Sequence, residues 1–170
     1  AVVAFFRSFG GASRQALAAQ STRDVLPALA EAGVELVCVG IGTDARAREF
    51  AAHVEFPLDR LYADPENTCY DALELKFGVR DTFFNEATPR AILARGLADD
   101  RAEDLRAALA RWRPWIPPKL SQGLQQGGMI VFEGDRTLFA HADPSTGAHA
   151  SLDEVLAVAV AGAKPAPSGA

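Results

Sequence analysis

The chain has 170 residues, of which 49% are apolar, and a formal net charge of −5 at pH 7. This length fits one domain, which buries about 70% of the surface that its unfolded chain exposes. The net charge argues against a nucleic-acid partner, because phosphate binding needs a clustered basic surface. No apolar run reaches the roughly 18 residues of a membrane span, so no transmembrane segment is predicted.

The number of cysteines and the identity of the first residue give information on the cellular compartment of the protein. Two cysteines, Cys38 and Cys69, do not make a disulfide framework and indicate a reducing compartment. Ala1 is not a methionine and already lies inside a strand-like apolar run, so we expect that a segment precedes it. A targeting signal would lie in that segment.

The first fourteen residues predict a strand, a glycine turn and the start of a helix. The apolar run 1–6 is the strand, and it leads through the loop Gly10, Gly11, Ala12, Ser13 and Arg14. Backbone N–H groups and the positive end of the helix dipole converge where such a helix begins. An anion or a thiolate would be stabilised at that point.

Alternating strands and helices are predicted in the first half. A helix over 13–32 kinks at Pro27, or a new helix starts near 21–22, because proline lacks an amide N–H. The apolar run 34–41 is typical of a strand buried on both faces of a parallel sheet. The elements that follow are a helix over 44–54, a short strand over 58–63 and a helix over 66–75.

The second half is less regular. The pattern predicts a loop over 78–85, a helix over 99–112 and an extended, proline-rich path over 111–119. Strands over 129–132 and 137–142 are joined by a hairpin turn, and a last helix runs over 151–161. Successive βα units, a hairpin and a final helix describe a thioredoxin-like α/β fold with helices flanking the sheet.

These motifs together resemble the peroxiredoxin-like 2 family, a branch of the AhpC/TSA antioxidant proteins. The resemblance covers residues 2–160 and rests on the segments 6–10, 33–42, 61–65, 70–73, 82–85, 125–128, 147–149 and 152–153. It implies a thioredoxin-like domain with a central mixed sheet over 1–162. The proline-containing residues that follow predict a flexible C-terminal tail over 163–170. The resemblance to plant and algal plastid members implies a chloroplast protein, soluble or peripherally associated.

Family members with a redox site carry cysteines directly after the Phe-Gly of the first loop. The matching stretch from Gly10 to Arg14 has none. A serine hydroxyl stays protonated unless a base is paired with it, and it forms no disulfide. We therefore expect a vestigial redox loop, no catalytic residue in it and no cofactor, with Ser13 as the N-cap of the helix.

The two thiols are weaker candidates for chemistry. Cys38 lies among valines in a predicted core strand, where a thiol is inert. Cys69 lies in the first turns of a helix that could lower its pKa, whereas Asp64 and Glu66 would raise it. We favour a role of Cys69 in helix packing, or a half-exposed thiol without a function. Cys69 is kept as a less favoured candidate for a reactive thiol. A bridge between Cys38 and Cys69 stays open.

Two polar groups near the C-terminal hairpin have structural explanations. His141, Asp143 and His149 match no standard zinc spacing, so hydrogen bonding is favoured and no metal is expected. Gln126 and the following glycines occupy the place where thioredoxin folds present a cis-proline loop. Because no proline is there, a peptide-clamping role is not supported, and close backbone approach explains the glycines.

The best surface candidate comprises Trp112, Trp115 and Ile116, framed by prolines and basic residues. Aromatic residues in a rigid extended segment make low-entropy anchors for a protein partner. The alternative is a loop packed over the core, and the residues alone do not decide between the two.

Two functions follow from these patterns. The favoured one is a redox-inactive binding or accessory subunit of a larger assembly, in contact with a protein partner. The other is an oxidoreductase that uses Cys69 or another unconventional thiol. A third and weaker possibility is an anion or small thiol ligand held at 11–14.

Overall fold

The computed structural model describes residues 1–10, 12–75, 77, 110, 115–144 and 148–163. A five-stranded mixed sheet has the strand order β3-β2-β1-β4-β5. Strands β1 to β3 pair in parallel, whereas β4 runs antiparallel to β1 and β5 antiparallel to β4. The predicted mixed sheet is confirmed, and its strands are β1 (Val2–Ser8), β2 (Leu36–Ile41), β3 (Leu61–Ala63), β4 (Gly128–Glu133) and β5 (Arg136–Ala142).

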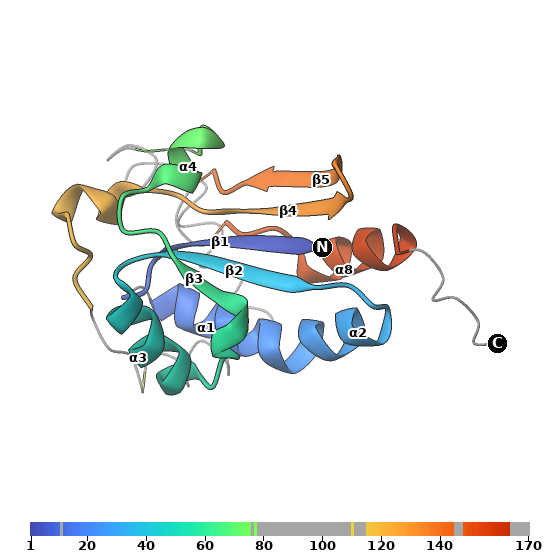
Figure 1. Ribbon diagram of the computed structural model, residues 1–170, viewed down its shortest axis with the longest axis horizontal. Helices are drawn as coiled ribbons and strands as arrows, with labels where there is room; N and C mark the ends of the chain where they lie inside the picture. Colours follow the sequence, from blue (N-terminus) through green and yellow to red (C-terminus); the bar gives the residue numbers. More distant parts are fainter. Residues whose placement is uncertain (11, 76, 78–109, 111–114, 145–147, 164–170) are drawn as a thin grey trace.

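Helices lie on both faces of this sheet (Figure 1). One face packs against the helices α1 to α3 and α8, and the other carries Tyr70 of α4. The side chains of β1 alternate between the faces, because Ala4 and Phe6 join the first cluster and Phe5 joins the second. The α-helices are α1 (Ala12–Gln20), α2 (Leu26–Glu31), α3 (Asp44–Val54), α4 (Thr68–Ala72) and α8 (Leu152–Ala161).

The first helix is irregular where the sequence predicts either a kink at Pro27 or a new helix near 21–22. A π-helical turn, η1 (Ser21–Val25), separates α1 from α2, and Pro27 is the second residue of α2. Proline cannot donate the i→i−4 hydrogen bond, so a regular α-helix cannot run through this position undisturbed. The helix then ends at Gly33, whose φ of 68° lies in the left-handed region that favours glycine.

The third strand and fourth helix are shorter than predicted. Residues Leu58–Arg60 form a 3₁₀ turn, η2, and only Leu61–Ala63 pair with β2. Helix α4 cannot start at Glu66 because Asn67 has a φ of 65°, and Glu74, with a φ of 51°, lies beyond its end. The predicted loop over 78–85, the predicted helix over 99–112 apart from helical Ala110, and the predicted tail over 163–170 apart from Ala163 lie outside the described residues.

Candidate functional site

A pocket of about 120 Å³ opens beyond the carboxyl ends of β1 and β2. Open α/β sheets usually bind their ligands beyond this edge, which makes the pocket the candidate site. The end of β1 and the start of α3 form one wall, and the proline-rich segment forms the other. The lining residues are Ser8, Phe9, Ile41, Gly42, Thr43, Arg46, Trp115, Ile116, Pro117 and Pro118.

Residues 115–125, which we call the strap, cross this edge from the side of α3 to the side of α4 (Figure 1). Trp115 holds the N-terminal end of the strap by packing its ring against neighbouring side chains. Its ring centroid lies 6.3 Å from that of Phe50 and 5.6 Å from that of His53, and the Arg46 guanidinium lies 5.6 Å above the ring. Ile116, the next residue, is 71% exposed. Trp115 thus packs onto the core while Ile116 faces outward, and Trp112 lies outside the described residues.

The second end of the strap is fastened by Gln122, within the 3₁₀ turn η3 (Leu120–Leu124). Its Nε2 donates to the Pro65 carbonyl oxygen at 2.6 Å and to Asn67 Oδ1 at 2.9 Å. The Lys119 amide donates to Gln122 Oε1 at 2.9 Å. Because this side chain is buried, its amide fixes the strap against the loop before α4.

The predicted redox loop is described at Gly10 and in the first turn of α1. Helix α1 begins at Ala12, so Ser13 and Arg14 belong to its first turn, and Ser13 does not take the N-cap position that the sequence favours. Gly11 lies outside the described residues. Gly10 lies against the strap, because a Cβ there would overlap the Trp115 carbonyl oxygen and lie 2.8 Å from the Trp115 amide nitrogen.

This contact leads to a stability prediction. The Gly10→Ala substitution is expected to lower the free energy of unfolding by about 2 kcal/mol, because the strap backbone must move away from the loop. Urea unfolding followed by tryptophan fluorescence measures the change. Gly123→Ala in the same strap is the control, since a Cβ at Gly123 meets nothing within 4 Å. Equal midpoints for the two variants would contradict the prediction.

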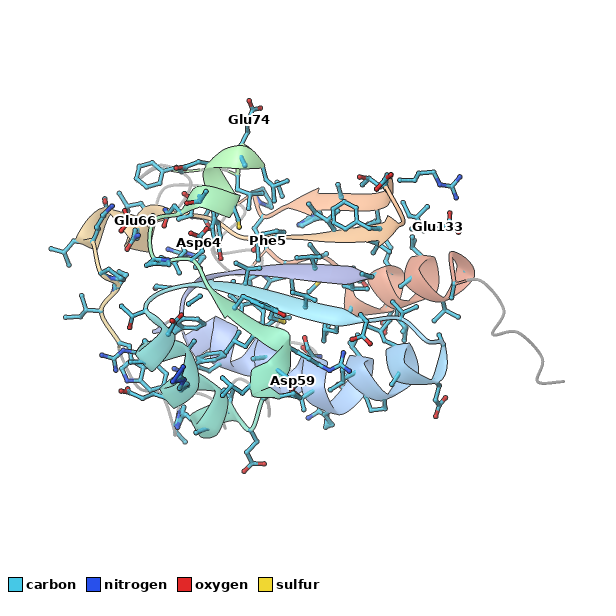
Figure 2. All side chains as sticks on the ribbon, viewed as in Figure 1. Phe5, Asp59, Asp64, Glu66, Glu74 and Glu133 are labelled. Atoms are coloured by element: carbon cyan, nitrogen blue, oxygen red, sulfur yellow. The ribbon has the colours of Figure 1, made fainter. Side chains whose placement is uncertain are left out.

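Both cysteines are free, and neither lines the pocket. Cys38 is completely buried in β2, and burial strongly raises its pKa. Cys69 is exposed on α4, and its pKa is raised by partial desolvation and then by the charge and hydrogen bonding of Asp64. The Asp64 carboxylate accepts hydrogen bonds from the amides of Thr68 at 2.9 Å and Cys69 at 2.8 Å, at the start of α4 (Figure 2).

The Asp64 carboxylate therefore has a testable effect on this thiol. Asp64→Asn is expected to lower the pKa of Cys69 toward its usual value, because it removes the charge that opposes thiolate formation. Wild-type Cys69 should thus react only at higher pH than the variant. The pH dependence of iodoacetamide alkylation at Cys69, followed by mass spectrometry, measures this. Glu66→Gln, which removes an exposed carboxylate paired with Lys119, is the control. An unchanged pH profile in Asp64→Asn would refute the prediction.

The structure brings together a buried polar cluster that the sequence did not connect with the loop. His149 Nδ1 lies 2.8 Å from Asp143 Oδ2, with side chains only 4% and 3% exposed. His141 Nε2 lies 3.6 Å from Asp143 Oδ1 and 3.2 Å from the Ala148 carbonyl oxygen. Within the described ranges, no group of three His, Cys, Asp or Glu residues is placed to hold a metal ion.

This cluster lies at the carboxyl end of β1, next to the start of β4. The Asp143 amide donates to the Gly127 carbonyl oxygen at 2.9 Å, and a Cβ at Gly127 would overlap the Phe5 carbonyl oxygen. Leu17 of α1 lines a small void together with Asp143 and His149. The glycines after Gln126 are thus explained by close backbone approach, of Gly127 to β1 and of Gly128 to His141 in β5, and not to Gly10.

Comparisons with known proteins agree with this architecture. A model of the AhpC/TSA antioxidant enzyme family matches residues 22–145. The chain is 32% identical over 162 residues to the thioredoxin-like protein AAED1, chloroplastic, of Arabidopsis thaliana, which covers 92% of this chain and 60% of that protein. The chain therefore spans less than two thirds of its relative. No solved structure matches. Within the described residues, no helix is long and apolar enough to cross a membrane.

The family match and the sheet topology point the same way. The matched residues run from η1 to just beyond β5, so they contain β2, β3 and the hairpin, and the order of these strands is that of a thioredoxin-like fold. The match begins at Thr22 and therefore does not include the loop from Gly10 to Arg14 that follows β1. The chain belongs to the AhpC/TSA antioxidant enzyme family.

Proposed function

We propose that this chain is a family member without thiol redox chemistry, which serves as a binding or accessory subunit of a larger assembly. The proposal rests on the positions and the pKa values of the cysteine thiols. The loop from Gly10 to Arg14 has no cysteine, and the pKa values of Cys38 and Cys69 are both raised.

Peroxide reduction by a protein thiol begins with the thiolate, which attacks the peroxide and becomes a sulfenic acid. A raised pKa lowers the thiolate fraction at neutral pH. The carboxylate of Asp64, whose Oδ2 accepts a hydrogen bond from the Cys69 amide, also disfavours the anion. Resolution of the sulfenic acid within the chain would need a second accessible thiol, and Cys38 is fully buried, so an external thiol would have to reduce it. Both requirements count against catalysis.

The binding role rests on the strap. Ile116 and Leu120 are 71% and 81% exposed, on a segment that Trp115 and Gln122 hold at its two ends. Exposed apolar side chains on a rigid backbone lose little entropy when a partner binds. We assign the partner contact to Ile116, with Trp115 as its support, and keep Trp112 as a sequence-based candidate.

A chloroplast location belongs to the same proposal. It is supported by the 32% identity to a chloroplastic protein of Arabidopsis thaliana. The chloroplast location of a fluorescent fusion of the full-length natural protein, viewed in plant cells, would test it.

The alternative function is an antioxidant oxidoreductase that uses Cys69. The exposure of this thiol and the membership of an antioxidant enzyme family favour it. A peroxide-consumption assay coupled to thioredoxin or glutathione separates the two. We expect no turnover above the rate without protein, for the wild type and for Cys69→Ser alike. Turnover that Cys69→Ser abolishes would establish the alternative.

A further inference from the structure

We propose that the pocket under the strap binds an extended protein segment with an apolar side chain next to a carboxylate. This inference rests on the proposed binding function and names the chemistry of the partner. A volume of about 120 Å³ corresponds to about four water molecules. It is well below the 300–1,000 Å³ of typical sites for small molecules and cofactors. A single side chain of a partner fits these dimensions.

Most of the pocket wall is apolar. Phe9 and Ile41 contribute from the sheet edge, and the ring of Trp115 and the pyrrolidines of the following prolines contribute from the strap. Phe9 is held in place because its ring packs directly on the backbone of Gly40 and Gly42. Phe9 and Ile41 are each 1% exposed and form the closed base of the pocket, so an aliphatic side chain that enters it gains apolar contact mainly with Trp115 and the prolines of the strap.

The positive charge of Arg46 favours a carboxylate on the partner, next to the apolar side chain that enters the pocket. Among the described residues that line the pocket, Arg46 is the one that carries a charge, and its side chain is 36% exposed. Its Nη1 donates to Glu49 Oε2 at 2.6 Å, and its guanidinium stacks on Trp115. Because a guanidinium carries five N–H donors in a planar fork, donors on its other nitrogens can serve a second carboxylate.

The pocket is also formed before a partner binds. Trp115 packs against Phe50, and Gln122 joins the strap to Pro65 and Asn67. Ordering of a loop is therefore not part of the cost of binding. Ile116 lines the pocket and is 71% exposed, so it would contact the bound segment beside the inserted side chain.

The test is an NMR titration of the full chain with two dipeptides, N-acetyl-leucyl-aspartyl amide and N-acetyl-leucyl-asparaginyl amide. The readout is the indole N–H signal of Trp115, assigned by its loss in Trp115→Phe. We expect a saturable shift with both, and about fivefold tighter binding of the aspartyl form, as for an exposed ion pair. Arg46→Gln should abolish that preference, whereas Arg48→Gln, on an exposed position of the same helix, should retain it.

Four results would overturn the proposal. Three of them are the absence of a saturable shift, equal affinity for the two dipeptides, and an aspartyl preference that survives in Arg46→Gln. The fourth is a concentration-dependent dimer in sedimentation that Ile116→Asp abolishes, because a second copy would then occupy the site. Peroxide turnover, which tests the proposed function, is not read by this titration, so the two can fail separately.

Discussion

Ser13→Cys is expected to give a thiol that iodoacetamide alkylates at least about tenfold faster at pH 7 than Cys69 does. Position 13 lies in the first turn of α1, where the helix dipole and the N-terminal amides stabilise a thiolate. Cys69 has the opposite environment, since partial burial and Asp64 raise its pKa. The scaffold would thus still activate a thiol at the place where the chain has none.

The measurement compares Ser13→Cys, with Cys69 replaced by serine, against the wild-type protein, in which Cys69 is the exposed thiol. Cys38 is fully buried in the structure and is common to both proteins. Ala52→Cys in the same background is the matched control, because Ala52 lies at an exposed position inside α3, away from its N-terminus. Equal alkylation rates at positions 13 and 52 would show that the start of α1 does not activate a thiol.

Asp143→Ala is expected to lower the free energy of unfolding by about 3 kcal/mol, the upper end of the range for the loss of a buried hydrogen bond to a charged group. The substitution leaves the buried His149 ring without the carboxylate 2.8 Å away and removes the contact of that carboxylate with His141. Both groups lie at the junction of the hairpin with β1, so the loss affects the centre of the sheet.

Chemical unfolding in urea, followed by circular dichroism, measures this loss. Asp135→Ala in the exposed hairpin turn is the control and should change stability by less than about 0.5 kcal/mol. A loss of less than about 1 kcal/mol in Asp143→Ala would mean that the Asp143–His149 pair contributes little beyond the hydrogen bonds that water would supply.

Much of the fold could be predicted because its signals are local. The apolar run before Ile41 identifies a buried strand, Pro27 identifies the interruption of the first helix, and Ser151 begins the last helix by accepting a hydrogen bond from the Glu154 amide at 3.5 Å. The position of α4 was less predictable. Its start depends on the left-handed backbone at Asn67 and on the Asp64 carboxylate, which replace the proline-led first turn that the sequence suggested.

The site could be predicted only in part, because its contacts join distant segments. The sequence identifies the loop after β1 and the aromatic, proline-framed segment, but not that Trp115 lies against Gly10 or that Arg46 covers its ring. His149 is 136 positions from Ser13, so no local pattern connects it with the first loop. The register of β4 against β1 brings the Asp143–His149 pair to that end of the sheet.

The central claim is that no thiol of this chain is activated for peroxide reduction. Its most direct test is the second-order rate constant of the reduced wild-type protein with hydrogen peroxide at pH 7, with trapping of any sulfenic acid at Cys69. We predict a rate constant no higher than that of free cysteine, because the pKa of Cys69 is raised. A rate constant about a hundredfold above that of free cysteine, lost in Cys69→Ser, would contradict the claim.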